Sequence, residues 1–433
     1  MKVVILGAGF GGLRLARKLN NKKGIEVQLI DRFNYHQFQP LFYQVATAGL
    51  DASNISFPIR KVFHKSTNVR IRMADVTGIR MEEKLVQTST GDVPYDQLVI
   101  AMGADTNFFG NDMLEEHAFP MKSTVEALQL RHKLLQNFED ALQAKDKGDE
   151  LLLQRLMNIV VVGGGPTGVE LSGAIADMKR FQLPRDFPEL DFRNMHIYLL
   201  EGTGRTLGTL SEKSSRHSQE YLERLGVTVK TNALLQEYDG KKAVLKDGSS
   251  IDTGLLIWAA GIKGNVPAGI DPAFIARGNR IKTDRSCRVA GQEHVFAIGD
   301  IAYMEEEAWP NGHPQVAPVA IQQADFIAKH FLQTLKGTAN PESLFQYKDK
   351  GSMATVGRNL AVVDVPKPKM HIKGFMAWLI WMSLHLMLIL GVKNRFFVFL
   401  NWLYNYVTYD QNLRLIFREF DRDAKQSARH TMT

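Results

Sequence analysis

The stretch Val3-Val4-Ile5-Leu6-Gly7-Ala8-Gly9-Phe10-Gly11-Gly12 decides the fold of this 433-residue chain. Apolar residues run directly into closely spaced glycines, which is the pattern of a buried parallel strand that turns into a helix. Gly7 would permit the tight turn, Gly9 would let the backbone approach a pyrophosphate, and Gly12 would let strand and helix pack closely. The stretch therefore predicts a dinucleotide-binding turn, although a glycine turn that serves only packing has the same spacing.

A second strand supports this interpretation. Residues 26–30 are apolar-rich and end in Asp31, about 20 residues after the turn, where a carboxylate accepts from a ribose hydroxyl. Arg32 follows at the same strand end. Residues 35–44, which contain Gln39-Pro40-Leu41, are rich in aromatic and amide side chains. They fit either a cover for a flat ring or a loop that packs its aromatic side chains into the core.

The same pattern occurs a second time. An apolar strand at 158–162 enters Gly163-Gly164-Gly165-Pro166-Thr167-Gly168, and its second strand, 196–200, ends in Glu201. A carboxylate there would accept from a ribose 2′-hydroxyl and repel a 2′-phosphate, which favours NADH over NADPH. Arg205 lies nearby and acts in the opposite direction. The second turn strengthens the dinucleotide-binding interpretation, because chance alone rarely produces this pattern twice in one chain.

Each nucleotide unit closes with an apolar strand and a glycine, since residues 98–103 and 255–261 resemble each other. The chain therefore carries an internal duplication in outline. A further strand, 295–298, ends in Gly299-Asp300, and we expect Asp300 to bind a ribityl or ribose hydroxyl; capping of a local turn is the alternative. Residues 317–335 fit a helix with Pro318 in its first turn.

Beyond Asn340 the sequence changes character. Residues 345–364 are strand-like, and Pro366-Lys367-Pro368-Lys369 fits a linker. Residues 374–392 carry no formal charge. As a helix they would be about 28 Å long, close to the thickness of the hydrocarbon core of a bilayer.

Residues 396–409 are aromatic, and polar side chains fall on one helical face there: Asn394, Asn401, Asn405 and Thr408. Cations surround this part of the chain: Lys393, Arg395, Arg414, Arg418 and Arg422. Tryptophan, tyrosine and cations suit the headgroup boundary of a membrane. We therefore expect helices at about 374–409 to associate with the interface; a hairpin buried in protein is the alternative.

Composition excludes several classes of protein. With 45% apolar and 23% charged residues, the chain is an ordinary globular protein of two or three domains. The net charge is +7, but no basic run with interleaved aromatic residues appears in its body, so we expect no nucleic-acid partner. The single cysteine, Cys287, supports neither an internal disulfide nor a cysteine metal cluster. No charged segment followed by an apolar run precedes the first strand, which predicts an intracellular site.

In the order of these parts the chain resembles the type II NADH dehydrogenases. These are single-subunit, FAD-dependent NADH:quinone oxidoreductases of the two-dinucleotide-domain flavoprotein superfamily. The resemblance covers nearly the whole chain. It rests on residues 7–12, Gln39-Pro40-Leu41, residues 163–170, Trp258-Ala259-Ala260-Gly261, Ala297-Ile298-Gly299-Asp300 and the tail from Phe375 to Ile416.

The resemblance implies an α/β fold with two Rossmann-like dinucleotide-binding domains, glutathione-reductase-like, and a C-terminal membrane-associating helical tail. Residues 1–117 and 267–337 would form a discontinuous FAD-binding domain, 118–266 the NADH-binding domain, and 338–433 the C-terminal region. The implied activity is NADH oxidation by noncovalent FAD, with electrons passed to a quinone and no proton pumping. The implied partners are quinone and a lipid membrane surface, and a homodimer is allowed. The implied location is peripheral, on the cytoplasmic face of a bacterial inner membrane.

The resemblance also implies roles for single residues. Glu170 and Gln322 would act at the nicotinamide and quinone region, although Glu170 also fits a simple complement to its helix dipole. The residues implied in cofactor binding are Gly7, Gly9, Phe10, Gly11, Gly12, Asp31, Arg32, Gln39, Pro40, Leu41, Gly103, Gly163, Gly165, Thr167, Gly168, Glu201, Ala260, Gly261, Gly299, Asp300 and Ala317.

One position departs from the family pattern. The family's quinone-side helix begins Ala-Gln-x-Ala-x-Gln, whereas this chain has Ala317-Pro318-Val319-Ala320-Ile321-Gln322. Pro318 has neither an N–H nor an amide side chain, so a contact made by the first glutamine would be missing or supplied by Gln315.

Other classes share both glycine turns. Disulfide-using flavoprotein reductases and sulfide:quinone reductases need redox cysteines, so the single cysteine excludes them. A soluble NADH-dependent reductase that uses ferredoxin or oxygen is compatible with a single cysteine, but that class gives no function to the apolar tail. A non-catalytic nucleotide-binding redox sensor is the remaining alternative.

Overall fold

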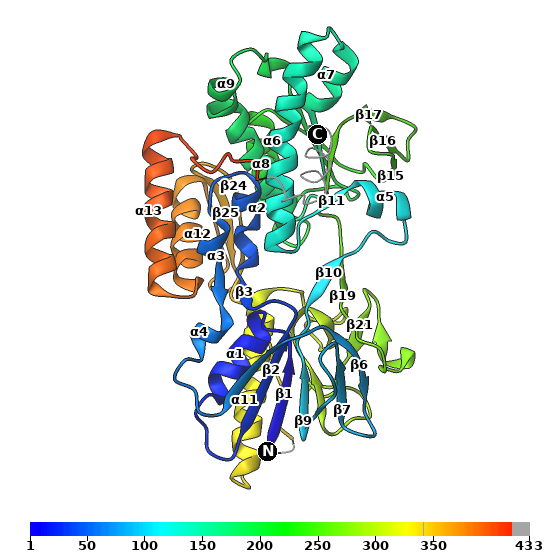
Figure 1. The fold of residues 1–433 in the computed structure, drawn as a ribbon, viewed down its shortest axis with the longest axis vertical. Coiled ribbons are helices and arrows are strands. Elements are labelled where there is room, and N and C mark those ends of the chain that lie inside the picture. The colour runs from blue at the N-terminus through cyan, green and yellow to red at the C-terminus, as the bar shows by residue number, and fades with distance from the viewer. Residues whose placement is uncertain (341, 418–433) are drawn as a thin grey trace, which may run out of the picture.

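The computed structural model describes residues 1–340 and 342–417. Arg418 and Arg422, two of the cations expected around the tail, lie outside the described residues. The described chain forms two α/β units, one above the other in Figure 1, with a C-terminal unit packed at their side.

The first unit is built on a parallel sheet in the order β22-β9-β1-β2-β5. Residues 3–6 of its central strand are apolar and fully buried, because α1 and α11 cover one face of the sheet and strands β6, β7 and β8 cover the other. The strands are β1 Lys2–Leu6, β2 Glu26–Asp31, β5 Val69–Met73, β9 Gln97–Ile100 and β22 Val295–Ala297, and the helices that pack together are α1 Phe10–Leu19 and α11 Ala317–Leu335. The helix expected at 317–335 is therefore confirmed.

The second unit repeats this plan, with a parallel sheet in the order β11-β18-β12-β13-β14. Ser123 and Glu126 form a capping box at the start of α6. The strands are β11 Phe119–Pro120, β12 Asn158–Val162, β13 His196–Leu200, β14 Val227–Lys230 and β18 Leu255–Trp258, and the main helices are α6 Thr124–Asp146, α8 Pro166–Phe181 and α10 Glu212–Arg224. The expectation of two Rossmann-like units is confirmed.

Smaller elements complete the two units. They are β3 Tyr35–Gln37, η1 Gln39–Leu41, α2 Phe42–Ala46, α3 Ala52–Ile55, β4 Ser56–Pro58, α4 Ile59–Val62, β6 Val76–Arg80, β7 Leu85–Thr88, β8 Val93–Pro94, α5 Asp112–His117, α7 Glu150–Met157, α9 Leu183–Asp186, η2 Phe192–Asn194, β15 Leu235–Tyr238, β16 Lys242–Leu245, β17 Ser250–Asp252, η3 Pro272–Phe274, β20 Ile275–Ala276, β21 Arg280–Lys282, η4 Gly299–Ile301 and β23 Ala302–Tyr303.

The chain passes between the units along β10, Ala104–Thr106, and β19, Ile262–Gly264, which pair antiparallel. Beyond β10, Phe108 and Leu114 are buried in the core of the second unit with residues of β12. Residues 107–117, expected in the first domain, therefore pack against the second unit, because their apolar side chains are buried there.

The C-terminal unit begins with an antiparallel sheet of β24 Ser352–Gly357, β25 Leu360–Val365 and β26 Met370–Lys373. The segment Pro366–Lys369 was expected to be a linker, and that expectation is wrong. It is the turn between β25 and β26, whose pairing starts at Val365 and Met370.

Two helices follow, α12 Gly374–Leu388 and α13 Val392–Thr408, and they lie side by side in Figure 1. The single helix expected at 374–392 instead ends at Leu388. The chain turns at Gly391, which has a φ of 82°. A Cβ at this position would also lie 2.5 Å from the ring of Phe57, so the turn requires glycine. Within residues 1–340 and 342–417, no helix has the length and apolar character needed to cross a bilayer.

The polar face of α13 docks onto the first unit. The Asn394 amide donates to the carbonyl oxygens of Ser53 and Asn54, and the Asn405 amide donates to that of Gly49. The opposite faces of α12 and α13 expose large apolar side chains: Phe375, Met376, Leu379, Met387, Leu388, Val392, Phe396, Phe397, Phe399, Leu400, Leu403 and Val407.

One hydrophobic core joins the C-terminal unit to both nucleotide units, and it includes Phe38, Phe138, Trp381 and Trp402. Strand β24 crosses α8 at Gly173, where a Cβ would lie 1.4 Å from the carbonyl oxygen of Val356. Only glycine permits this approach, which places the C-terminal sheet directly on the helix that carries Glu170.

Candidate active site

The first glycine turn forms a cradle between β1 and α1. Gly7 has a φ of 96°, and a Cβ on Gly12 would lie 1.9 Å from the carbonyl oxygen of Gly7. A Cβ on Gly9 would meet no atom of the described residues within 4 Å, so the cradle is open there. No side chain of the described chain caps the start of α1, which leaves its first N–H groups pointing into this open space. The cradle therefore fits a pyrophosphate.

Asp31, at the end of β2, accepts a hydrogen bond from the backbone of the first cradle. Its Oδ2 accepts from the Ala8 nitrogen at 2.6 Å, and its Oδ1 accepts from the Phe33 nitrogen at 2.7 Å. Burial raises the pKa of Asp31, and these two hydrogen bonds oppose the shift. The predicted ribose contact would add to these backbone contacts, and it stays a prediction. Arg32 is exposed beside it.

The second glycine turn repeats this geometry between β12 and α8. Gly163 has a φ of 109°, and a Cβ on Gly168 would lie 1.9 Å from the carbonyl oxygen of Gly163. Gly165 is open in the way Gly9 is, and Thr167 is exposed beside it. Glu201 takes the place of Asp31, since its Oε2 accepts from the Gly164 nitrogen at 2.6 Å. The inferred duplication thus extends to the hydrogen bonds.

The closing strands also match. A Cβ on Gly7 would lie 2.3 Å from the carbonyl oxygen of Ala101, and one on Gly163 would lie 2.5 Å from that of Ala259. Gly103 comes two residues after Ala101, and Ala260 and Gly261 come directly after Ala259. The predicted residues from both strands therefore lie at the mouths of the two cradles.

Aromatic side chains lie next to the first cradle. The ring of Phe10 makes edge contacts with His36 and Phe38, at centroid distances of 5.4 and 5.8 Å. The Gln39–Leu41 segment forms η1, in which Leu41 is fully buried and can offer a ligand only its backbone, while Gln39 is exposed. The loop therefore packs apolar side chains into the core, as one alternative predicted, while its role as a cover for a flat ring stays a prediction.

Asp300 lies in η4, directly after β22. Burial raises its pKa, and the positive charges of Lys122 and Arg280 oppose the shift. Its carboxylate accepts no hydrogen bond from the described residues, which leaves it available to a ligand hydroxyl. Lys122 also approaches Gln39, with 3.5 Å between Nζ and Oε1.

The glutamines near the start of α11 have separate partners. Gln322 exchanges two hydrogen bonds with the backbone of Lys348, both 3.0 Å long, so the structure does not bring it together with Glu170. Gln315 donates to the backbone oxygen of Asp300 at 2.9 Å, and buried Gln323 accepts from the Gly299 nitrogen at 2.8 Å. Ala317 is the first residue of the helix. A catalytic role for Gln322 therefore stays a prediction that these contacts do not favour.

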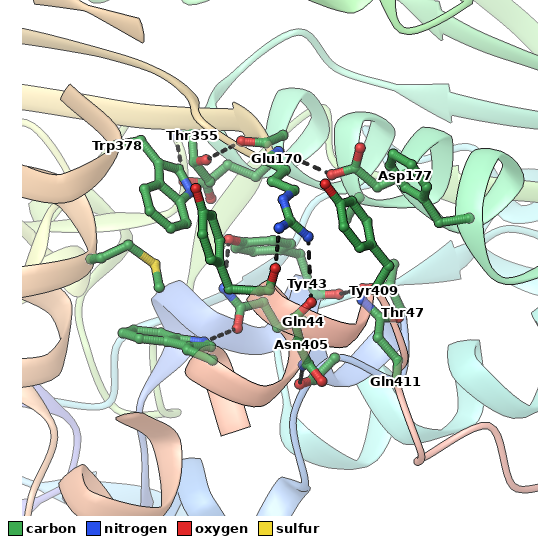
Figure 2. A pocket seen from close by; sticks show the side chains of 18 of the residues that line it. Tyr43, Gln44, Thr47, Glu170, Asp177, Thr355, Trp378, Asn405, Tyr409 and Gln411 are labelled. Atoms are coloured by element: carbon green, nitrogen blue, oxygen red, sulfur yellow. Dashed lines mark hydrogen bonds between the residues drawn. The ribbon is translucent and has the colours of Figure 1, made fainter. Parts of the chain in front are cut away.

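Glu170 lines a cavity of about 150 Å³ between α8, α2, β24 and the two C-terminal helices, which we call the Glu170 cavity (Figure 2). Its Oε1 accepts from the backbone nitrogen of Thr355 at 3.3 Å. Burial raises the pKa of Glu170 to about 8. At neutral pH the side chain therefore holds a proton inside a largely apolar wall.

A buried tyrosine lies opposite Glu170. The Tyr43 hydroxyl accepts from Nε2 of Gln44 at 2.8 Å, and Oε1 of Gln44 accepts from the Trp402 indole at 2.7 Å. Burial raises the pKa of Tyr43 well above its ordinary value, and the negative charge of Glu170 adds to the shift. The hydroxyl therefore stays protonated.

A second carboxyl group shares the cavity with Glu170. Asp177 lies two turns further along α8, and its Oδ2 accepts from the backbone nitrogen of Arg358 at 3.0 Å. Burial raises the pKa of Asp177 to about 6. The Arg358 guanidinium lies over the rings of Tyr406 and Tyr409, at 4.1 and 3.6 Å from their centroids.

His385 stacks on Trp381 with 3.9 Å between ring centroids, and its Nδ1 lies 2.8 Å from the Trp381 carbonyl oxygen. Burial lowers the pKa of His385 to about 4, so the ring is neutral at physiological pH. Its ring also makes an edge contact with Phe38, which places a polar but uncharged group between α12 and the first unit.

Sequence reasoning did not single out several of these residues: Tyr43, Lys122, Asp177, Arg358 and His385. Asp177 carried a usable signal, because it lies seven residues after Glu170 and therefore on the same face of a helix. Lys122 and Arg358 carried none, since only the tertiary fold brings them to the site.

Two family models match the chain. The model of the pyridine nucleotide-disulphide oxidoreductases matches residues 1–324, and that of the NDH2 C-terminal domain matches residues 350–408. Together they cover the two nucleotide units and the C-terminal unit.

Individual proteins are also similar. The type II NADH:quinone oxidoreductase Ndh of Mycobacterium tuberculosis is 36% identical over 93% of this chain and 87% of that protein. NdhA of the same organism is 33% identical over 93% of this chain and 86% of its own length. The structure of NDH2 from Plasmodium falciparum in complex with NADH shares the fold, with a TM-score of 0.85 at 22% identity over 96% of this chain and 99% of that chain.

Proposed function

The chain belongs to the type II NADH:quinone oxidoreductases, and from that premise we propose that it oxidises NADH and passes the electrons through FAD to a quinone at a membrane surface, without pumping protons. Membership confirms the resemblance drawn from the motifs. The observation that carries the proposal is the pair of matching open cradles, with buried Glu170 on the helix that leaves the second one.

The two cradles divide the cofactors between them. The first, with Phe10 and η1 beside it and Asp300 available to a hydroxyl, would hold FAD, and the second would hold NADH. FAD, when bound, accepts a hydride from the nicotinamide and passes the electrons on to the quinone. We expect the cofactor to be held without a covalent bond, because the first cradle offers it backbone N–H groups and the free carboxylate of Asp300, and Cys287 is buried.

Glu201 accounts for the choice of nicotinamide nucleotide. It occupies the strand end where the ribose of a bound dinucleotide lies, and its negative charge would repel a 2′-phosphate. Arg205 is turned toward Gly208 and Glu212, donating to the former at 3.0 Å and lying 3.9 Å from a carboxylate oxygen of the latter. These contacts draw the cation away and favour NADH.

Glu170 supplies the protonation that quinone reduction needs. The carboxyl group is protonated at neutral pH because it is buried, and the cavity gives it a wall of tryptophan and tyrosine side chains. A buried acid with a pKa near the operating pH is suited to giving a proton and recovering it. The role would require the quinone headgroup to reach the wall that α8 shares with α12.

The outer faces of α12 and α13 support attachment to a membrane surface. Their exposed apolar side chains form a face that water solvates poorly, while the polar side chains of α13 are satisfied by the first unit. Because relatives include bacterial enzymes, we place the protein on the cytoplasmic face of a bacterial inner membrane, as a peripheral protein. A homodimer stays a prediction of the resemblance.

Anaerobic reduction of the purified holoprotein tests the proposal. NADH should bleach the flavin absorbance, and a short-chain quinone should then restore it. Bleaching without recovery would point to another acceptor, and failure to bleach would point to a nucleotide-binding sensor.

A further inference from the structure

The proposed reaction consumes a proton from water in every turnover. NADH and quinone give NAD⁺ and hydroquinone; the hydride carries both electrons and one hydrogen, and the second hydrogen arrives as a proton. If Glu170 gives that proton, it must recover one before the next turnover. Glu170 as a whole is only 9% exposed, so the protein needs a route from solvent to its carboxyl group.

The Glu170 cavity has the shape of such a route. Glu170, Ala174, Asp177 and Phe181 all line it, and their spacing places them on one face of α8. This row is about 16 Å long at the rise of an α-helix. At its far end Tyr409 packs on Phe181 and is 36% exposed, so the cavity approaches solvent there.

Side chains that can carry a proton line the cavity along this face of α8. Figure 2 shows Glu170 and Asp177 on the same helix, facing residues of α2 and α13 across the pocket. Tyr43 comes from the α2 side and is close enough to both carboxyl groups for each to raise its pKa. Because the Tyr43 oxygen accepts from Gln44, its own proton is left for another acceptor.

The charged groups around Asp177 favour inward transfer. Arg358 faces it from the turn after β24, Arg180 lies on its own helix, and Tyr43, Tyr406 and Tyr409 complete the surroundings. The pKa of Asp177 is raised to about 6 and that of Glu170 to about 8. A proton held at Asp177 is therefore more acidic than one held at Glu170 and passes toward the interior.

We propose that Asp177 takes a proton from solvent at the Tyr409 end of the Glu170 cavity and returns it to Glu170 through Tyr43 and water. This inference rests on the proposed function. Asp177 does not touch the quinone; it acts through Glu170 and is a positioning residue for the proton. The volume of the cavity and the polar side chains in its lining, among them Gln44, Thr47 and Asp177, suit a short chain of water molecules along the same path.

The test compares Asp177→Asn with wild type, using FAD-loaded enzyme in a pH series. With a short-chain quinone, kcat should fall by about tenfold or more, while KM for NADH stays unchanged. With ferricyanide, which takes electrons without protons, the variant should match wild type. Sodium formate, a small acid that can enter the cavity, should restore part of the quinone rate, and Asp177→Glu should restore most of it.

Two controls separate this role from a structural one. Asp325→Asn removes an aspartate that lies outside the cavity and pairs with Arg14, and it should leave quinone reduction unchanged. Infrared titration of the carboxyl band that Glu170→Gln removes should still give a pKa near 8 in Asp177→Asn.

Other outcomes would overturn the inference. An unchanged quinone kcat in Asp177→Asn would do so. A raised KM for quinone without rescue by formate would show instead that the cavity positions the quinone. A wild-type enzyme that reduces ferricyanide but no quinone would contradict the proposed function itself.

Discussion

The Oε1 atom of Glu170 lies 3.3 Å from the backbone nitrogen of Thr355, a residue 185 positions further along the chain. The carboxyl group comes from the second nucleotide unit, and the strand that covers it comes from the C-terminal unit. The surroundings of Glu170 are therefore complete only when these two parts are docked.

Glu170→Gln keeps the size of the side chain and removes its proton. Steady-state quinone reduction should fall by about 10²- to 10⁴-fold, the range expected when a positioned acid or base is lost. Stopped-flow absorbance at the flavin band separates the half-reactions. Slower oxidation by quinone with normal reduction by NADH would assign proton delivery, slower reduction would assign nicotinamide positioning, and two normal phases would leave Glu170 as a helix-dipole complement.

The raised pKa of Glu170 predicts how stability depends on pH. The folded protein holds this proton up to a pKa of about 8, whereas the ordinary value for the unfolded chain is 4.5. The folded state thus binds more protons between these values, and its stability declines across that window as pH rises, by up to about 1.4 kcal/mol per pH unit from this group.

Thermal unfolding of Glu170→Gln and wild type at several pH values checks this prediction. The variant lacks the buried charge, so the difference in Tm in its favour should grow from pH 4.5 to pH 8 and then level off. A difference that does not vary with pH would show that Glu170 has an ordinary pKa in the folded protein.

Glu201→Gln should weaken the preference for NADH over NADPH. The amide keeps one oxygen acceptor for the Gly164 nitrogen but no longer repels a 2′-phosphate. The measurement is the ratio of kcat/KM for the two nucleotides, with FAD content as a control that should not change. The same ratio as wild type would place discrimination elsewhere, with Arg205 the next residue to test.

Charges placed on the outer face of α13 should release the protein from membranes. Phe396 and Leu403 are 56% and 49% exposed, so aspartate at both positions should leave the fold intact and abolish co-sedimentation with anionic vesicles. Leu151, 80% exposed on α7, is the matched control, and Leu151→Asp should still sediment. Equal sedimentation of both variants would exclude this face as the attachment surface.

Gly173→Ala should loosen the C-terminal sheet from α8. The added methyl group would lie 1.4 Å from the Val356 carbonyl oxygen, and overpacking of this kind costs about 1–3 kcal/mol or more. Thermal unfolding should show the loss. Gly208→Ala, where a Cβ meets no described atom within 4 Å, should unfold like wild type.

The nucleotide units could be predicted because their signals are local. Strand, glycine turn and helix N-terminus are adjacent in sequence, so Gly7 and Gly12 indicate the geometry that the structure has. Asp31 and Glu201 followed from the same motif, and their places against the two turns agree with that reasoning.

The C-terminal unit was less predictable because its contacts are distant in sequence. Nothing near Gly173 indicates that β24 will cross it, and nothing near Pro366 distinguishes a hairpin turn from a linker. Apolar composition predicted the helices at 374–409 but not the break at Gly391, which depends on the ring of Phe57 from the first unit.

The hydrophobic core that runs from Phe38 through Phe138 to Trp381 and Trp402 joins the C-terminal helices to both nucleotide units. Because α12 and α13 share that core with the second nucleotide unit, pulling them apart would expose apolar side chains of both, so we expect the two to unfold together. On the proposed membrane surface, the second cradle would then keep one height and tilt relative to the outer face of α12 and α13. Calorimetry should accordingly register a single melting event for the helices and the nucleotide unit together.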